Sequence, residues 1–373
     1  MIVLSQYKTL PVDKFASVFN DTTNSYKFYW FLSILDELTE NKKTQIPIKT
    51  LNERMFEYIW YPIEYFNLSF GKSDGFIKIF NFIKQTGITP DYSGDSENLI
   101  SQIRHDPVNS SILNELEKKI DHLARWVPYR FLRPFFFNET RGMKDSSVNT
   151  TIRKLTNEKS KMEPESVPYW FSGSESIVIN DIWATYFIEN IGILKSFTLW
   201  HLNKFLQSKN PSVPGICDKL FRPSQRNLYR YTSAWKMFAS TNKLECLYSG
   251  QTINDGFTLD HFIPWSFVTH DLNWNLVPSL KESNISKGNR LPNLRMYLEP
   301  FSDLQYSFFK TFYHANPKNQ VLEEYCILFN SNLEDINLIS SHDFKHKIYT
   351  TISTMEQIAA NMGFARGWYY HSA

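Results

Sequence analysis

The stretch from Cys246 to Pro292 holds the side chains of this sequence that could do chemistry together. Asp260 and His261 are adjacent, and Asn284 and Lys287 follow with three residues' spacing between them. An imidazole is largely unprotonated near neutral pH and is still basic enough to accept a proton. A carboxylate and an amide oxygen suit Mg²⁺, a hard cation that takes few protein ligands and keeps several waters. These residue types therefore fit a proton acceptor placed beside a divalent cation.

Three short motifs in this stretch resemble those of the HNH, or ββα-metal, nuclease family. They are Asp260-His261-Phe262-Ile263-Pro264, Trp274-Asn275-Leu276-Val277-Pro278 and Asn284-Ile285-Ser286-Lys287. The resemblance does not extend to the rest of the 373 residues. It implies an endonuclease that hydrolyses phosphodiester bonds with the help of Mg²⁺ or Mn²⁺.

The resemblance also implies a role for each polar residue of these motifs. His261 would be the general base that deprotonates the attacking water, and Asp260 and Asn284 would be the metal ligands. Asn275 would hold the loop that carries the histidine, and Lys287 would contact phosphate. This chemistry requires the Asp260 carboxylate and the Asn284 amide to share one cation, and the His261 ring to be open to water.

The local pattern predicts two strands and a short helix around these residues. Neighbouring side chains of a strand face opposite sides, so Asp260 and His261 can serve one site only if the strand ends there. Pro264 fits such an end, because proline cannot donate a hydrogen bond to a neighbouring strand. Residues 274–278 predict the second strand of a hairpin, and residues 282–289 predict a helix. On that helix Asn284 and Lys287 would lie one turn apart on the same face.

One feature of many family members is missing from this stretch. A zinc knuckle places paired cysteines before the Asp-His pair and more cysteine near the final Asn. Here Cys246 keeps the first position, but Ser249 and Ser283 stand where further thiols would be. A single thiolate does not make a tetrahedral zinc site, so structural zinc is not expected. Apolar packing by Leu247, Tyr248 and Trp274 is expected to hold the hairpin instead.

Basic residues before the motifs predict a contact with nucleic acid. Residues 219–236 mix Lys and Arg with aromatic residues and contain no acidic residue. On a helix, Arg222, Arg226 and Arg230 would share one face and fit a DNA backbone, although a solvated helix face fits the same pattern. Arg290 and Lys287, inside the motif region, are further candidates for this contact.

A second basic cluster surrounds the aromatic run 129–137. It consists of Arg125, Arg130, Arg133 and Arg141. In one interpretation the guanidinium groups bind phosphate while the rings stack on bases. In the other, which we favour, the aromatic run is core and its arginines point outward.

The composition favours folded domains. Apolar residues make up 42% and aromatic residues 16% of the chain, which is unlike a disordered sequence. The net charge of +2 neither requires nor excludes nucleic acid. Three cysteines at unrelated spacings do not form a disulfide framework. With no long apolar run or signal-peptide pattern, a cytoplasmic protein without a membrane segment is expected.

The helical patterns predict a mainly α (α+β) fold, with helical N-terminal and C-terminal regions around a small ββα-metal HNH core. The predicted divisions are a helical domain at 1–140, a linker or loop at 141–165, a helical region with a basic face at 166–240, the nuclease core at 241–300 and C-terminal helices at 301–373.

The leading functional hypothesis is a DNA endonuclease of bacterial restriction or anti-phage defence, with RNA as an alternative substrate. The biological role rests on analogy with the family alone. Two alternatives are a nucleic-acid-binding protein with a vestigial HNH site, and a nuclease effector subunit controlled by a sensor partner. If each active site cuts one strand, cleavage of both DNA strands would require a homodimer.

Overall fold

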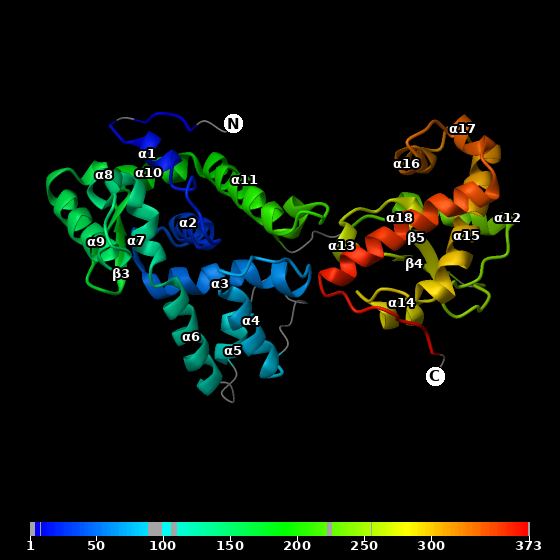
Figure 1. Ribbon diagram of the computed structural model, residues 1–373, viewed down its shortest axis with the longest axis horizontal. Helices are drawn as coiled ribbons and strands as arrows, with labels where there is room; N and C mark the ends of the chain where they lie inside the picture. The colour runs from blue at the N-terminus through cyan, green and yellow to red at the C-terminus, as the bar shows by residue number, and fades with distance from the viewer. Residues whose placement is uncertain are drawn as a thin grey trace. The chain divides into compact units, whose positions relative to one another are not determined.

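The chain divides into two compact units, Met1–Pro211 and Ser212–Ala373, which are described separately below. The computed structural model describes residues 4–7, 9–88, 99–105, 110–221, 226–254 and 256–371. Helices dominate these residues, with two small antiparallel sheets, which confirms the predicted mainly α (α+β) class (Figure 1). None of the described helices has the length and apolar character needed to cross a membrane.

Helix α2 (Tyr26–Asp36) lies at the centre of the first unit (Figure 1). Every residue of α2 except Lys27 is buried, because α3, α7 and α11 pack around it. The other elements of this unit are α1 (Val12–Ala16), η1 (Glu37–Asn41), β1 (Gln45–Pro47), α3 (Ile48–Glu64), α4 (Phe76–Gln85), α5 (Leu99–His105), α6 (Ser110–Ala124), α7 (Val127–Leu132), η3 (Arg133–Phe136), α8 (Phe137–Thr140), α9 (Asp145–Met162), η4 (Pro164–Ser166), β2 (Tyr169–Ser172), β3 (Ser176–Ile179), α10 (Asp181–Glu189) and α11 (Ile191–Lys209).

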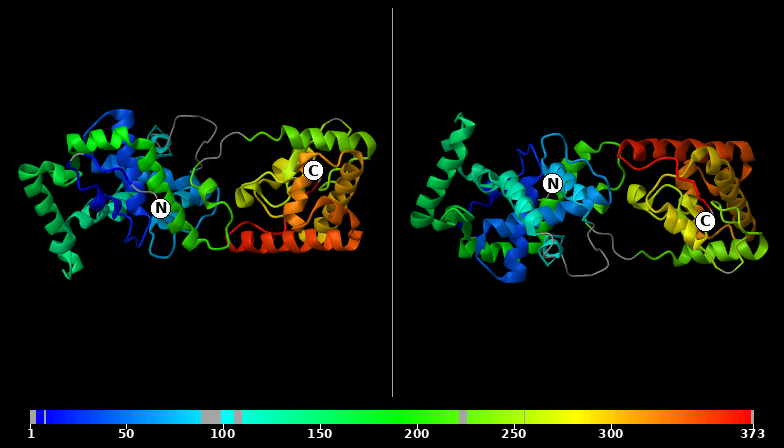
Figure 2. Two further views of the ribbon diagram at one scale, coloured as in Figure 1. Left: turned by 90° about the horizontal axis from the view of Figure 1, so that it is seen from above. Right: turned by 90° about the horizontal axis from the view of Figure 1, so that it is seen from below.

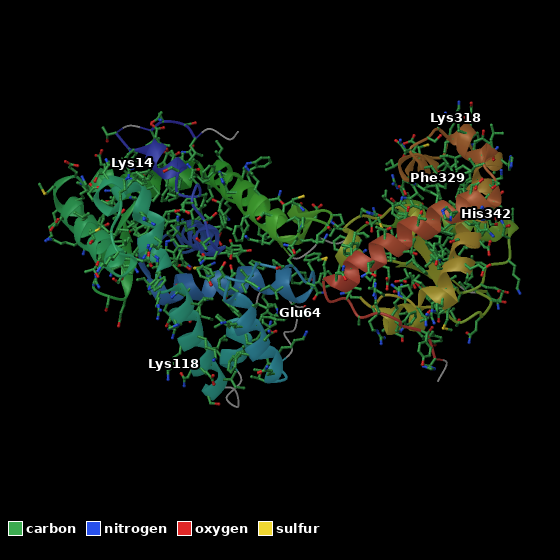
Figure 3. All side chains as sticks on the ribbon, viewed as in Figure 1. Lys14, Glu64, Lys118, Lys318, Phe329 and His342 are labelled. Atoms are coloured by element: carbon green, nitrogen blue, oxygen red, sulfur yellow. The ribbon has the colours of Figure 1, made fainter. Side chains whose placement is uncertain are left out.

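The first unit is tied together across its sheet and its N-terminal segment. Strand β3 lies between β1 and β2, and both pairings are antiparallel. The Tyr169 hydroxyl on β2 accepts a hydrogen bond from the indole of Trp30 on α2 and donates one to the Pro128 carbonyl on α7. Lys14 on α1, labelled in Figure 3, donates to the Phe135 carbonyl.

The prediction of a linker or loop at 141–165 was wrong. Most of this range forms α9, which buries Val148, Ile152 and Thr156 on one face. The remaining α9 residues are largely polar, so three buried positions spaced by four were too sparse a signal among Ser, Thr, Asn and Lys. The predicted region 166–240 falls partly in each unit, since the units divide after residue 211.

The second unit surrounds a two-stranded hairpin with helices. Strands β4 (Thr258–His261) and β5 (Leu276–Ser279) pair antiparallel, with Asp260 opposite Val277 and His261 opposite Leu276. The long helices α15 and α18 pack against each other beside it (Figure 2). The elements of this unit are η5 (Ile216–Lys219), α12 (Tyr229–Thr241), β4, α13 (Trp265–Val268), η6 (Asn273–Asn275), β5, α14 (Lys281–Lys287), α15 (Leu294–Ala315), α16 (Gln320–Phe329), α17 (Leu333–Leu338) and α18 (Ser341–Asn361).

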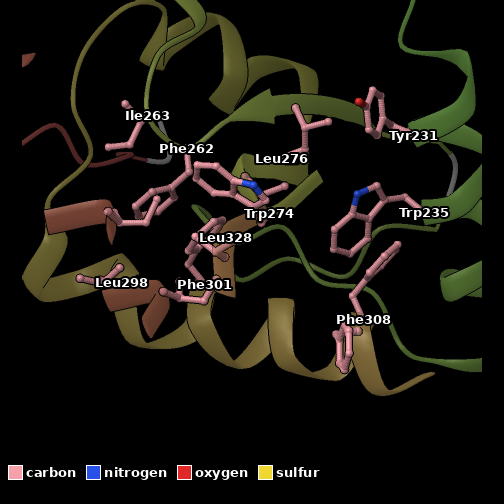
Figure 4. Packing of buried hydrophobic residues seen from close by; sticks show 14 of the residues in the cluster. Tyr231, Trp235, Phe262, Ile263, Trp274, Leu276, Leu298, Phe301, Phe308 and Leu328 are labelled. Atoms are coloured by element: carbon pink, nitrogen blue, oxygen red, sulfur yellow. The ribbon is translucent and has the colours of Figure 1, made fainter. Parts of the chain in front are cut away.

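The end of β4 is fixed to α15 by aromatic packing (Figure 4). Phe262, which directly follows His261, stacks on Phe301 of α15 with ring centroids 4.1 Å apart and an interplanar angle of 19°. Both rings are fully buried. Trp235 on α12 packs on Phe308, further along α15, at 4.3 Å. The chain around His261 is therefore held by a helix that lies outside the motifs.

Replacing Phe301 with Ala should destabilise the second unit by about 3–5 kcal/mol, because it leaves a cavity beneath Phe262. Urea unfolding followed by tryptophan fluorescence measures this loss. Met296→Ala, on an exposed position of the same helix, is the control and should change stability by less than about 0.5 kcal/mol. Equal unfolding midpoints for the two variants would contradict the packing argument.

Candidate active site

Asp260 forms a buried ion pair with Lys287. The lysine ammonium on α14 lies 2.9 Å from Asp260 Oδ2 and 3.2 Å from Oδ1, and it donates to the His261 carbonyl at 2.7 Å. The Tyr248 hydroxyl donates to Asp260 Oδ2 at 2.5 Å. Since Lys287 is only 1% exposed, its charge balances the carboxylate, and the predicted phosphate contact of Lys287 does not fit this position.

Asn284 lies against the same strand. Its amide nitrogen donates to Thr258 Oγ1 at 3.0 Å and to the Leu259 carbonyl at 3.4 Å. Thr258 and Asp260 share one face of β4, because side chains alternate along a strand. The Asn284 amide oxygen has no hydrogen-bond partner among the residues that the structure describes. The Asn284 side chain thus contacts Thr258 on the strand face that also carries the Asp260 carboxylate.

His261 faces a different partner, Asp271, which the sequence analysis did not single out. Its Nε2 lies 2.8 Å from Asp271 Oδ1. The histidine is only 5% exposed, so the expectation of a ring open to water was wrong for this arrangement. Burial lowers the pKa of His261, and the hydrogen bond that its ring donates to Asp271 opposes that shift.

Asp271 itself is held as a carboxylate. Burial would raise the pKa of Asp271, but its bonds to His261 and its proximity to Arg226 outweigh burial and lower it. The Arg226 guanidinium lies 3.4 Å from the Asp271 carboxylate. The segment between the two strands therefore brings the Asp271 carboxylate to Nε2 of the His261 ring. No short spacing in the sequence marks this pair, since Asp271 lies ten positions after His261 in the chain.

Asn275 closes the loop that follows His261. Its side-chain oxygen accepts from the Ile263 amide and its side-chain nitrogen donates to the Ile263 carbonyl, both at 2.9 Å. The Phe262 amide donates to the Asn275 carbonyl at 2.8 Å. Asn275 is fully buried. Its side chain makes two hydrogen bonds to the backbone of Ile263, which hold the chain after His261.

Comparison with protein-family models matches residues 246–293 to the HNH endonuclease family. This segment is similar to HNH endonuclease domains and is called the HNH domain below. The match agrees with the resemblance of the three motifs and supports a nuclease, without distinguishing a restriction or anti-phage type. Comparisons with curated proteins and with solved structures found no significant match.

The position of the zinc knuckle in the HNH domain is filled by a hydrogen-bonded thiol. Cys246 Sγ lies 3.4 Å from Ser283 Oγ and accepts from the Leu280 amide at 3.4 Å. Burial would raise the pKa of Cys246, but hydrogen bonds from Ser249 and Ser283 outweigh it and lower the pKa. These three side chains thus join the segment before β4 to α14 through hydrogen bonds.

The donors available to a cation near the HNH hairpin are oxygen atoms. Within the described ranges, no three or more His, Cys, Asp and Glu side chains are grouped so that they could hold a metal ion. Any cation at this site would therefore rely on the Asp260 carboxylate and the Asn284 amide, with water or substrate completing its shell. That set suits Mg²⁺ or Mn²⁺, which bind few protein oxygens, better than zinc.

Arg226 and Arg230, which were predicted to share a helix face, do not do so. Helix α12 begins only at Tyr229, whose amide donates to the Asn227 side chain, so Arg226 precedes the helix. Arg230 pairs with Glu324 and Tyr231. Arg222 lies outside the described residues. Arg226 is thus the predicted contact residue that reaches the His261 site, through Asp271.

Arg290 is also engaged with the domain itself. Its guanidinium donates to the Ser286 and Lys287 carbonyls at the end of α14 and lies 5.9 Å from the Trp368 ring centroid. A cation at a helix C-terminus satisfies carbonyls that the helix leaves unpaired. The side chain remains exposed. A phosphate bound here would share the Arg290 guanidinium with the carbonyls at the end of α14.

Lys287→Met should destabilise the HNH domain by about 3–5 kcal/mol, because it leaves the Asp260 charge buried without a counter-ion. Chemical unfolding measures the loss. Lys281→Met, on the exposed first turn of the same helix, is the matched control. In the double variant Lys287→Met/Asp260→Asn most of the lost stability should return. If the double variant is no more stable than Lys287→Met, a pairwise charge interaction between Asp260 and Lys287 is contradicted.

Proposed function

We propose that this protein is a metal-dependent endonuclease that hydrolyses DNA phosphodiester bonds. The observation that carries the proposal is His261, placed at the end of β4 in an HNH domain and held on one ring nitrogen by Asp271. His261 is the general base, and Asp260 and Asn284 are the metal ligands. RNA is the alternative substrate, because the residues of the motifs would act on the phosphate group, which DNA and RNA share.

The contact with Asp271 supports a defined tautomer of His261. With Nε2–H donating to the carboxylate, the lone pair of Nδ1 is left to accept a proton from water. Nδ1 makes no hydrogen bond within the described part of the chain. When His261 takes up that proton, the negative charge of Asp271 stabilises the imidazolium, as in other carboxylate–histidine pairs. Asp271 is therefore a positioning residue.

A divalent cation, when bound, would supply Lewis-acid stabilisation of the charge that develops on the phosphate oxygens. The Asp260 carboxylate and the Asn284 amide oxygen are the groups that would hold it. Lys287 stays beside Asp260 and offsets part of its charge. Arg226, next to Asp271, is the proposed contact for the substrate phosphate.

The wider biology is proposed from the family resemblance. We place the activity in the bacterial cytoplasm, in restriction or anti-phage defence. One HNH site cuts one strand, so double-strand breaks would use a homodimer or a partner subunit. The burial of His261 favours one alternative, a nucleic-acid-binding protein with an inactive HNH domain, and activity measurements separate the two.

His261→Ala should reduce nicking of supercoiled plasmid in Mg²⁺ or Mn²⁺ by about 10²–10⁴-fold, the usual contribution of a general base. Binding of the same plasmid should be retained. His342→Ala, which alters an exposed histidine on α18, is the matched control and should cut like the unmodified protein. If neither the unmodified protein nor His261→Ala nicks DNA or RNA with either metal, the inactive alternative is correct.

Asp271→Asn should lower kcat at least about tenfold and leave KM nearly unchanged, because an amide no longer fixes the histidine tautomer. Steady-state nicking kinetics give the two constants, and a thermal melt checks that the fold is intact. Asp303→Asn removes a carboxylate paired with Lys345 on the surface and should leave both constants unchanged. A change confined to KM would instead assign Asp271 to substrate binding.

A further inference from the structure

The first unit contains a cavity of about 340 Å³ where the start of α2 meets the end of α6 and α7. Its lining includes Trp126, Arg130 and Arg133, from the second basic cluster of the sequence. The aromatic run of that cluster is largely core, since Phe131, Leu132, Phe135 and Phe136 are buried. Two of its four arginines, Arg130 and Arg133, line this space, which has the size that small ligands occupy.

The cavity lining contains three basic side chains, Lys27, Arg130 and Arg133, and two acidic ones, Asp21 and Asp145. The Lys27 ammonium donates to the Val18 carbonyl at 3.1 Å and to the Asp21 carbonyl at 2.8 Å, which leaves a third proton available. The pKa of Lys27 is lowered to about 8, mainly by burial and in smaller part by the charges of Arg133 and Arg130, while the charge of Asp21 opposes the shift. A bound anion would relieve this repulsion.

The two arginines of the cavity differ in their partners. Arg130 is fixed by Asp145 at 2.7 Å and by the Asn149 side chain at 2.7 Å, so its charge is neutralised. Arg133 makes no hydrogen bond or ion pair with the described residues. Its planar guanidinium, half-buried in the wall, suits bidentate binding of a phosphate.

An aromatic surface adjoins these donors. The Trp126 indole is 49% exposed, which is unusual for so large an apolar side chain. The guanidinium groups of Arg125 and Arg130 lie 5.0 Å and 5.9 Å from its ring centroid. An exposed indole beside arginines is a common platform for nucleobases, because it stacks on any base while the cations bind phosphate.

We propose that this cavity binds one nucleoside monophosphate group, with the phosphate against Arg133 and Lys27 and the base against Trp126. The group is either a free nucleotide or one nucleotide of a nucleic-acid strand. The site lies entirely within the first unit and is separate from the HNH domain. It gives the N-terminal half of the chain a ligand-binding role of its own, which does not depend on nuclease activity.

Isothermal titration calorimetry of the full-length protein tests this site with deoxyadenosine 5′-monophosphate as the probe. Binding should weaken at least about tenfold in Arg133→Gln, which removes one charge-assisted contact. Arg141→Gln, an exposed arginine of the same cluster outside the cavity, should bind like the unmodified protein. Deoxyadenosine, which lacks phosphate, should bind weakly to both.

Two further measurements sharpen the outcome. Trp126→Ala should weaken the binding of the mononucleotide while leaving the binding of inorganic phosphate unchanged. Competition by a single-stranded oligonucleotide that depends on Arg133 would identify a nucleic-acid strand as the source, whereas competition by mononucleotides alone would identify a free nucleotide. The proposal is overturned if the unmodified protein binds neither probe, or if Arg133→Gln binds both as well as Arg141→Gln does. The same titrations with His261→Ala should give unchanged affinities, so a failed nuclease assay leaves this test intact.

Discussion

The buried ion pair between Asp260 and Lys287 is the constraint around which the HNH hairpin is built. Two charges taken from water are costly, and here each is compensated within the motif: the carboxylate by Lys287 and the Tyr248 hydroxyl, the ammonium by Asp260 and the His261 carbonyl. The pair joins β4, α14 and the segment before β4 at one point. It therefore fixes the backbone on which His261 and Asn284 depend, and the proposed cation would share the Asp260 carboxylate with a lysine.

The charged groups near His261 are paired with one another. His261 is held by Asp271, and the nearby arginines are paired with acidic side chains, Arg226 with Asp271 and Arg230 with Glu324. In the proposed function, substrate phosphate would compete with these carboxylates for the same guanidinium groups. Such competition would favour a strongly charged polyanion over small anions.

The sequence was informative where chemistry and spacing coincide. The strands around Asp260 and Asn275 and the helix of Asn284 could be predicted, because their motifs tie residue type to local geometry. Asp271 could not, since a loop aspartate carries no periodic signal and becomes meaningful only when the hairpin folds it onto His261. The buried state of Lys287 was missed for a related reason: lysine is usually a surface residue, and only its tertiary partners reverse that expectation.

The loop that carries Asp271 is anchored by helices that lie beyond the matched segment. The Asn273 amide donates to Glu324 on α16, and its side-chain amide donates to the Tyr325 hydroxyl. Gln305 on α15 donates to the Leu276 carbonyl at 2.8 Å and accepts from Tyr325 at 2.6 Å. All of these groups are buried, so each depends on its partner for hydrogen bonding. The hairpin and short helix alone would leave that network unpaired, and the C-terminal helices are therefore an integral part of the structure that positions the histidine.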